Sequence, residues 1–391
     1  MAAVDVPAYD LGPLPTVVLI GAIVAMVPLI WVVWRHRRSD PAVRRRALTM
    51  LTLFLTFDLV LFGAFTRLSD SGLGCPDWPG CYGSASPLGA HESIGAAQSA
   101  MPTGPVTHGK AWIEMLHRYL ATGVGALITV LAVTAWLEAR QRRSTATMAV
   151  SPWWPTVTWF WVCGQGAFGA LTVTMKLYPA IVTLHLLGGL GLLALLAIQS
   201  QLHLRSTLNL SPALKRGVIA VLGLVIVQTA LGGWVSTNYA VLACAEFPTC
   251  QGSWWPPMDF GHGFTVLREL GAGKDGGYLP FAALTAIHMV HRIGAAILVL
   301  AIGVLVWRLW ATGDKVLHRW AMALTGATAW QVATGLGNVL FDWPLLAAVS
   351  HTGGAAVLLV LFSILLTRAW PQPAAIPTAV SSSRRGMHAA S

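Results

Sequence analysis

The sequence predicts an all-α integral membrane protein with nine transmembrane helices, arranged as two parallel-repeat four-helix bundles plus one extra N-terminal helix. Three observations predict this fold class. The chain of 391 residues is 55% hydrophobic and only 10% charged, whereas soluble domains carry about 25% charged residues. Apolar runs of about 20 residues, long enough to cross a bilayer core, recur along the chain. Finally, the second half of the chain repeats features of the first half in the same order.

Polar and charged connections separate nine apolar runs, and each run is a predicted membrane span. The runs cover residues 15–34, 47–66, 113–137, 154–174, 180–203, 215–235, 280–310, 319–340 and 344–367. Alternate connections, with the C-terminal tail, hold 17 Lys and Arg residues, and the opposite set holds five. Because Lys and Arg are enriched on the cytoplasmic side, the first set is predicted to face the cytoplasm. The net charge of +10 therefore indicates orientation, and we expect no nucleic-acid partner.

The predicted domain organisation follows from these spans. Residues 1–46 form the extra N-terminal transmembrane helix and a basic cytoplasmic loop, and residues 47–203 form the first four-helix bundle. A cytoplasmic linker over 204–214 leads to the second bundle, residues 215–367. The tail, residues 368–391, is rich in Ala, Pro and Ser and is predicted to be a disordered cytoplasmic segment.

An internal duplication is visible in the order of cysteines, glutamines and histidines. The segment "CPDWPGC" returns 169 residues later as "CAEFPTC", and histidine-containing segments return after 174 and 166 residues. The matched pairs are Cys75 with Cys244, Cys81 with Cys250, His117 with His291, Gln165 with Gln331, and His185 with His351. Both copies begin on the predicted cytoplasmic side, so the two repeats are expected to be parallel.

Each repeat places two histidines inside predicted spans at comparable depth: His117 and His185, then His291 and His351. Polar side chains in membrane spans are rare and usually face the bundle interior. A haem iron needs two axial ligands, one on each face of the ring, whereas zinc would require further ligands. The competing interpretation is that each histidine makes an ordinary interhelical hydrogen bond. The duplication favours two haem sites, with these four side chains as iron ligands.

Small and basic residues accompany these histidines. Three of the histidines are followed three residues later, on the same helix face, by a glycine: Gly188, Gly294 and Gly354. We expect each glycine to leave room for a porphyrin or to serve helix packing. Three arginines near the outer surface are candidate partners for haem propionates, or side chains that extend to the membrane interface: Arg67, Arg118 and Arg292.

Two acidic residues raise separate questions. Glu114 precedes His117 by three residues, and His288 occupies the same position before His291. A carboxylate beside a haem can take protons, so we interpret Glu114 as catalytic, with an interfacial charge near the helix start as the alternative. His288 is interpreted as a neighbour of the ligand or an alternative axial ligand. Asp58 lies within the second span, where it is expected to give proton access or to pair with a buried partner.

Four motifs together resemble the haem A synthase family, membrane enzymes that serve cytochrome oxidase assembly. They are "GAFTRLSDSGLGCPDWPGC" (63–81), "EMLHR" (114–118), "HMVHR" (288–292) and "SHTGG" (350–354). The resemblance covers about residues 50–367. It implies eight helices in two halves, so that the first span is an addition. It also implies that haem O is oxidised at a ring methyl, by successive hydroxylations with oxygen from water, to the formyl group of haem A.

The resemblance assigns roles to matching residues. His117 and His185 would hold the haem that is oxidised, His291 and His351 would hold a resident haem b, and Glu114 would be the essential acid. Expected partners are haem O, membrane lipid, an electron acceptor of unknown identity, and possible contacts with haem O synthase and oxidase assembly factors. The expected location is the inner (plasma) membrane, with the cysteine loops on the periplasmic side. Two alternatives are a bis-histidine cytochrome b that transfers electrons and a non-enzymatic haem carrier.

The outer loops each contain a cysteine pair, from which we infer their structure and role. On the oxidising side of a membrane, Cys75 with Cys81 and Cys244 with Cys250 are predicted to form disulfides. Pro76 and Pro79 stiffen the first loop further, and we expect the loops to act as lids that exclude water from the sites. The alternatives for the first pair are thiol redox chemistry and a metal site with His91 and His108. Cys163 is expected to pack within the membrane.

Overall fold

The computed structural model describes residues 7–141, 150–204 and 207–370. Within these ranges the chain is helical, with isolated β-bridges and no β-strand, so the predicted all-α class is confirmed. In chain order the elements are α1 (Leu14–Arg35), α2 (Pro41–Leu68), α3 (His91–Ala100), α4 (His108–Gln141), α5 (Trp153–Thr174), α6 (Pro179–Leu202), α7 (Pro212–Thr237), the 3₁₀ helix η2 (Ala240–Ala243), α8 (Phe260–Gly263), α9 (Phe281–Trp310), α10 (Lys315–Leu340) and α11 (Leu345–Ala369). Most of the tail predicted to be disordered, from residue 371, lies outside the described residues.

Seven of the described helices are long and apolar enough to cross a membrane: α1, α2, α4, α6, α7, α9 and α11. The protein is therefore an all-α, multi-pass membrane protein. The prediction of nine spans is not confirmed, because α5 and α10 fall short in apolar character although they have 22 and 26 residues. Polar residues lower the mean hydropathy of both helices. Gln165 and several threonines lie in α5, and α10 begins with Lys315, His318 and Arg319.

Helix starts follow ordinary capping chemistry. Asp40 precedes α2 and accepts a hydrogen bond from the amide of Ala42 at 2.7 Å. Ser211 caps α7 in the same way, and Asp314 caps α10. Side-chain acceptors of this kind satisfy amide groups that have no partner in the first turn of a helix. Pro41 occupies the first position of α2, where a missing N–H costs nothing.

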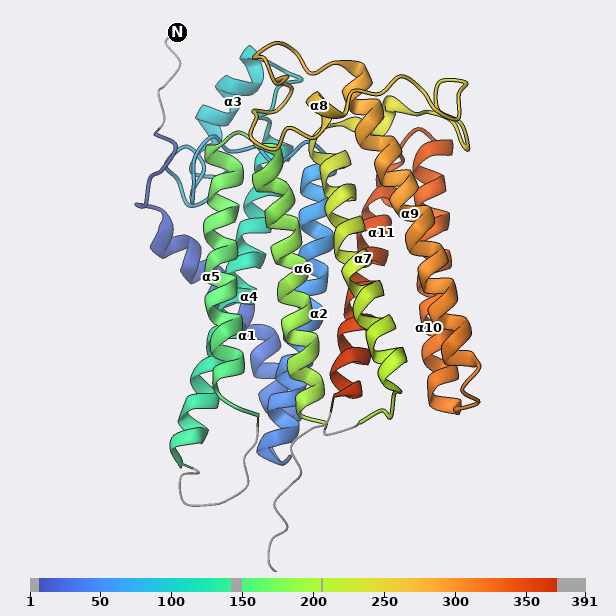
Figure 1. The fold of residues 1–391 in the computed structure, drawn as a ribbon. Helices are drawn as coiled ribbons and strands as arrows, with labels where there is room; N and C mark the ends of the chain where they lie inside the picture. Colours follow the sequence, from blue (N-terminus) through green and yellow to red (C-terminus); the bar gives the residue numbers. More distant parts are fainter. Residues whose placement is uncertain (1–6, 142–149, 205–206, 371–391) are drawn as a thin grey trace, which may run out of the picture.

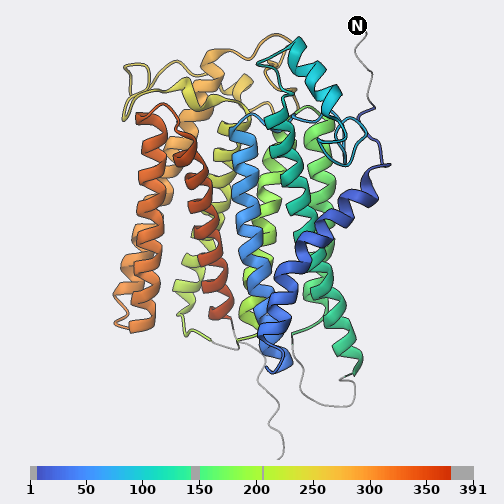
Figure 2. The ribbon, with the colours of Figure 1, turned by 180° about the vertical axis from the view of Figure 1, so that it is seen from behind.

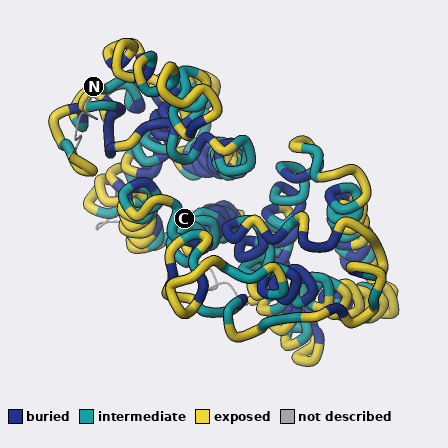
Figure 3. The backbone as a smooth tube through the Cα atoms, turned by 90° about the horizontal axis from the view of Figure 1, so that it is seen from above, coloured by how far each residue is buried: buried dark blue, intermediate teal, exposed yellow. Residues whose placement is uncertain are grey.

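The long helices pack in two groups. In the first group α2 contacts α4, α4 contacts α5, α5 contacts α6, and α6 returns to α2. In the second group α7, α9, α10 and α11 contact one another in the same cyclic order. Helix α1 packs mainly on α4 and crosses it obliquely (Figure 2). The groups join where α6 contacts α7 and where α11 contacts α2 and α6, and they lie side by side when seen from above (Figure 3).

Packing differs between the two ends of the helices. The short helices α3, η2 and α8 and the two cysteine loops lie together at one end of the long helices (Figure 1). We call this end the loop end. The largest cluster of buried apolar side chains lies toward the opposite end and includes Leu53, Ile128, Leu193, Val221 and Phe362. The four histidines lie on the other side of this core, six to ten residues from the first residues of α4, α6, α9 and α11, which are at the loop end. The apolar core thus supports a polar site that lies beneath the loops.

Candidate functional site

The four histidines form two pairs. His117 on α4 and His185 on α6 lie close enough to interact electrostatically, and so do His291 on α9 and His351 on α11. All four side chains are partly buried, and within the described residues none of their Nε2 atoms makes a hydrogen bond. Each pair comes from the second and fourth helices of one packing group. Each pair therefore keeps two ring nitrogens available as ligands.

A glycine on the preceding helix lies against each imidazole. A Cβ placed on these glycines would lie 3.0 to 3.5 Å from the ring Cε1 atom, which is tighter than ordinary contact at three of them and van der Waals contact at Gly169. The four pairs are Gly63 with His117, Gly169 with His185, Gly232 with His291, and Gly335 with His351. The helix backbone therefore forms one wall of each imidazole site, and the same close contact recurs four times.

The glycines that follow three histidines do not leave room for a porphyrin, and this expectation from the sequence was wrong. The amide side chain of a glutamine from the neighbouring helix fills the space over each one. The pairs are Gln165 over Gly188, Gln228 over Gly294, and Gln331 over Gly354. In each case the glutamine Oε1 is buried without a hydrogen-bond partner. The sequence comparison of the repeats matched Gln165 with Gln331 but missed Gln228. Each of the three glutamines lies four residues before the glycine that contacts an imidazole.

The second nitrogen of each ring differs between the pairs. His351 Nδ1 lies 3.0 Å from the hydroxyl of Thr334, and His291 Nδ1 lies 2.9 Å from the amide nitrogen of Gln228. The Nδ1 atoms of His117 and His185 are buried and have no hydrogen-bond partner in the described structure. Buried polar atoms without partners are uncommon in native proteins. The two pairs are thus alike in position but not in hydrogen bonding.

These pairs do not resemble a structural metal site. Among the described residues there is no group of three or more His, Cys, Asp and Glu side chains that could hold a metal ion. Zinc sites use three or four protein ligands, whereas a haem iron takes two axial ligands from opposite faces of its ring. Paired imidazoles with free Nε2 atoms between the helices of a bundle therefore fit haem ligation.

Glu114 and Arg118 hold the first cysteine loop. Both side chains are buried, and they form an ion pair. Glu114 Oε2 accepts a hydrogen bond from the amide of Cys75 at 2.9 Å. Arg118 Nη1 donates to the carbonyl oxygens of Asp77, at 3.0 Å, and Gly80. The carboxylate is therefore fixed one helical turn from His117, between the ligand and the loop.

Arg292 holds the second loop at equivalent points. Its guanidinium donates to the carbonyls of Cys244 (3.0 Å), Glu246 (2.8 Å) and Thr249 (3.0 Å). Glu246 and Thr249 are the residues 169 positions after Asp77 and Gly80. His288, which replaces the acid, places Nδ1 3.1 Å from the carbonyl of Ala240 in η2. His288 therefore contacts the loop backbone rather than the histidine pair.

The two cysteine loops share their internal structure. Disulfides join Cys75 to Cys81 and Cys244 to Cys250, and cis peptide bonds precede Pro79 and Pro248. An acid closes each loop: Asp77 accepts from the amide of Gly83 at 2.8 Å, and Glu246 from that of Gly252 at 2.5 Å. Both glycines have φ near +70°, a conformation that other residues rarely adopt.

The hydrogen bond from Gly252 has an electrostatic consequence. Glu246 is fully exposed, and the bonds from this amide and from the Thr249 hydroxyl hold the pKa of its carboxyl below its usual range. A carboxylate that accepts such bonds is stabilised in its charged form.

Arg67 lies where the two groups of helices meet. Its guanidinium donates to the hydroxyl of Tyr239 at 3.0 Å and to the carbonyl of Ser236 at 2.9 Å, both at the loop end of α7. The Tyr239 hydroxyl donates in turn to Asp70 at 2.8 Å. Ser236 and Tyr239 are the residues 169 positions after Arg67 and Asp70. Equivalent positions of the two repeats therefore meet here.

Four further residues singled out in the sequence analysis are Asp58, Cys163, His91 and His108. Asp58 is exposed on α2, next to the exposed Phe54, and has no hydrogen bond or ion pair in the described structure, so the expected buried partner is not found. Cys163 is a free thiol that is exposed on α5, so within the described residues it does not belong to the buried core. The rings of His91 and His108 lie 4.5 Å apart between centroids.

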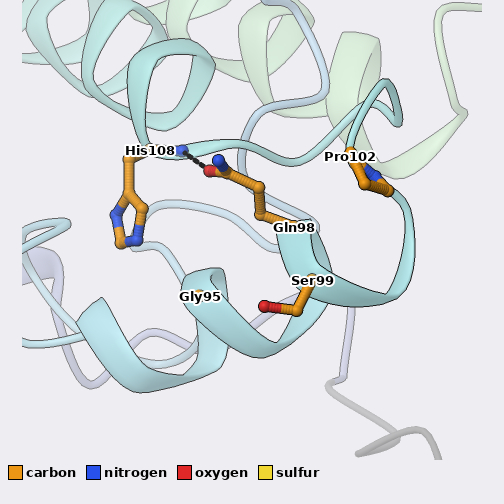
Figure 4. Close-up of a pocket in the computed structure, with 5 residues that line it drawn as sticks. All are labelled: Gly95, Gln98, Ser99, Pro102 and His108. Carbon is orange, nitrogen blue, oxygen red and sulfur yellow. Dashed lines mark hydrogen bonds between the residues drawn. The ribbon is translucent and has the colours of Figure 1, made fainter.

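His108 also lines a cavity at the loop end. The cavity has a volume of about 300 Å³ and is lined by Gly95, Gln98, Ser99, Pro102 and His108 (Figure 4). The amide of His108 donates to Gln98 Oε1 at 3.0 Å. A metal site that joins His91 and His108 to Cys75 and Cys81 would require thiolates. The disulfide between these cysteines leaves none.

Comparisons with known proteins place the chain in a family. Residues 46–363 match the profile of the family described as cytochrome oxidase assembly protein (COX15-CtaA). The heme A synthase of Shewanella oneidensis is 38% identical over 325 residues, covering 80% of this chain and 93% of that protein. Heme A synthases of Caulobacter vibrioides and Halalkalibacterium halodurans are 29% and 26% identical, each covering 78% of this chain and 90% of the relative. A match over most of the chain shows that this protein belongs to the COX15-CtaA family of cytochrome oxidase assembly proteins.

Proposed function

We propose that this protein is a haem A synthase that oxidises a methyl group of haem O to the formyl group of haem A for cytochrome oxidase. The two histidine pairs within the helices, one of them beside a buried carboxylate, are the observation on which the proposal rests. The 38% identical heme A synthase of Shewanella oneidensis supports the same activity. Each hydroxylation adds one oxygen from water and removes two electrons and two protons. The second gives a hydrated aldehyde, which loses water to form the formyl group.

The proposed topology has nine crossing helices, with α5 and α10 included. Two parallel repeats, α2–α6 and α7–α11, each form a four-helix bundle, and α1 is the extra helix. The matching cyclic order of contacts in the two groups supports this arrangement. The protein would lie in the inner (plasma) membrane with its loop end on the periplasmic side, as the distribution of Lys and Arg favours.

His117 and His185 are proposed to hold the haem that is oxidised, and His291 and His351 to hold a resident haem b. A haem b held by His291 and His351 would supply reversible one-electron chemistry. The histidines would contribute Nε2 as the ligand atom, with a glycine of a neighbouring helix beside each ring. Electrons leave to a separate electron acceptor. Haem O synthase and oxidase assembly factors are the proposed neighbours in the membrane.

Glu114 is the proposed proton acceptor. Its carboxylate is buried and fixed by Cys75 and Arg118, one helical turn from His117. When water supplies oxygen to the methyl carbon, a proton has to leave that water. A fixed carboxylate in a dry site is suited to accept it. The guanidinium groups of Arg118 and Arg292, each adjacent to a ligand histidine, would hold the loops and also favour the haem carboxylates by their charge.

The cysteine loops are proposed to cover the two sites. Each loop is tied to the helix that carries a ligand histidine, the first through Arg118 and the second through Arg292. A disulfide-closed loop in this position keeps bulk water from the helices beneath it, which strengthens the electrostatic interactions in the site.

Haem extraction tests the proposal. Membranes that contain this protein and a source of haem O should yield haem A on chromatography, and Glu114→Gln should retain haem O and form little haem A. Loss of a positioned acid or base typically costs about 10²- to 10⁴-fold in rate. Glu92→Gln is the matched control, because Glu92 is exposed on α3, which carries none of the four histidines. If the protein were only an electron-transferring cytochrome b, Glu114→Gln should retain full electron transfer. If it were a haem carrier, it should bind haem without forming the formyl product.

A further inference from the structure

The Nδ1 partners of the four imidazoles follow a pattern that separates the two halves. In the second half, Gln228 and Thr334 contact the Nδ1 atoms of His291 and His351. The repeat offset of 169 aligns Gln228 with Leu59, and the offset of 166 aligns Thr334 with Phe168. Both polar partners are therefore replaced by apolar residues at the equivalent positions of the first half.

The consequence for the first half is visible at its imidazoles. The Nδ1 atoms of His117 and His185 are buried and have no hydrogen-bond partner in the described part of the chain. Phe62 stacks on the His117 ring, with centroids 6.2 Å apart and planes inclined by 18°. Gln165 lies near His185 over Gly188 but makes no hydrogen bond to the ring.

Thr334 supplies the side-chain partner of His351, beside the backbone of Gln331, which also contacts the ring. Its hydroxyl donates to the carbonyl of Trp330 at 2.8 Å, so the same oxygen is left to accept a hydrogen bond from Nδ1–H of His351 at 3.0 Å. The proton of the neutral imidazole then lies on Nδ1, and Nε2 keeps the lone pair that an iron requires. Partners of this kind orient a ligating histidine and raise its basicity.

Gln228 acts on His291 through its amide. Its Nε2 lies 2.9 Å from Nδ1 and also donates to the backbone carbonyl of His291 at 2.9 Å, which fixes the ring relative to its own helix. Gln228 Oε1 is buried without a partner. The bond to the backbone carbonyl sets which end of the amide faces the ring, so the role of Gln228 is to hold the imidazole in place between α7 and α9.

We propose that Gln228 and Thr334 are positioning residues that make the second-half site retain its haem, and that Leu59 and Phe168 leave the first-half site free to exchange. This inference rests on the proposed function, because a synthase must take up haem O and release haem A at one site. Its other site must keep its haem through many turnovers. The difference in exchange is then set by one hydrogen bond to each imidazole rather than by the identity of the ligands.

The experiment measures haem retention in the purified full-length protein. Excess apomyoglobin captures released haem, and the change in the Soret band gives the rate of loss. We expect Gln228→Leu and Thr334→Val to release the second-half haem about tenfold faster or more, the usual effect of losing such a partner. Thr334→Ser keeps the hydroxyl and should restore slow release. Leu59→Gln should slow release from the first-half site.

The outcomes separate this inference from the proposed function. Unchanged release from both Gln228→Leu and Thr334→Val would overturn the inference, provided that His291→Ala still abolishes the slowly released haem. Equally fast release from Thr334→Ser and Thr334→Val would also overturn it, because packing rather than the hydroxyl would then decide retention. Failure of the proposed function gives a different result. The wild-type protein would then bind haem without forming haem A, or would bind none.

Discussion

Arg118 combines two tasks in one guanidinium group. It neutralises Glu114 and caps two carbonyl groups of the first cysteine loop, all in a buried environment. Arginine suits this position because its planar fork presents several donors at fixed angles, which lysine does not. Arg292 has a comparable set of loop carbonyls but no acidic partner at the position of Glu114, where His288 stands.

Removal of Arg118 should therefore cost more than removal of Arg292. We expect Arg118→Ala to destabilise the protein by about 3 kcal/mol, because it leaves a buried carboxylate without its counter-charge. Arg292→Ala leaves three loop carbonyl groups unpaired and removes a charge near the exposed Glu246, so it should cost about half as much. Thermal unfolding of both variants in detergent checks the order. Equal losses would indicate that Glu114 does not depend on its arginine.

Glu246 gives the second loop a dependence on pH. Hydrogen bonds from Gly252 and Thr249 lower the pKa of this carboxyl in the folded protein, so the folded state binds its proton less readily than the unfolded state. The stabilisation is present above the unfolded pKa, about 4.3, and is lost as pH falls through the lower folded pKa. Limited proteolysis of the second loop should accelerate in that acidic range. Glu246→Gln should remove the pH dependence, and an unchanged acid response in this variant would contradict the assignment.

At the scale of elements, the cysteine loops are the most regular units of the protein. Closure of a loop by a disulfide with a sequence separation of six residues contributes about 2 kcal/mol, mainly by restricting the unfolded chain. The first loop also supplies the Cys75 amide to Glu114. The second loop has no such contact with an acid on its helix.

Paired substitutions should separate stability from activity. Cys75→Ser with Cys81→Ser and Cys244→Ser with Cys250→Ser should each lower stability by about 2 kcal/mol. The first pair should also reduce haem A formation, because Glu114 loses a fixed hydrogen-bond donor. Melting temperature and haem A content are measured together. If the first pair lost all activity at unchanged stability, thiol redox chemistry would be the better explanation for these cysteines.

The sequence was a good guide to elements and a poor guide to contacts between them. Long apolar runs predicted the seven helices that the structure supports as spans, because hydropathy and length are local properties. The four histidines were found because duplication makes them recur in order. The partners of Glu114 and Gln228 were not found. Cys75 is 39 residues from Glu114 and His291 is 63 residues from Gln228, and only packing brings them together.

The glycines show why such contacts escape a sequence argument. Gly188 was interpreted as open space because its own helix leaves a gap there, yet Gln165 from α5 fills that gap. A missing side chain on one helix is informative only when the residue facing it is known. The regular spacing of glutamine and glycine on one helix indicates which residues face the histidine helix. It can be interpreted only when it is known that α5 packs on α6 and α7 on α9.

At the scale of the whole molecule, the arrangement depends on α5 and α10. Each completes the ring of contacts in its group, since α5 joins α4 to α6 and α10 joins α9 to α11. Their polar residues explain why neither is apolar enough to be identified as a span by composition. Gln165 of α5 and Gln331 of α10 lie against the neighbouring ligand helix, where a polar side chain is shielded from lipid.

If α5 and α10 cross the membrane, the connections at their two ends lie on opposite sides. In a Cys163→Ser background, Met175→Cys and Phe341→Cys introduce exposed thiols at the predicted outer ends, and Ser151→Cys and Ala311→Cys introduce them at the predicted inner ends. A membrane-impermeant maleimide should label the first two variants in intact cells with a permeable outer membrane. The other two should react only after the inner membrane is broken. Labelling of both ends of α5, or of α10, from the same side would show that this helix does not span, and the two-bundle topology would then fail.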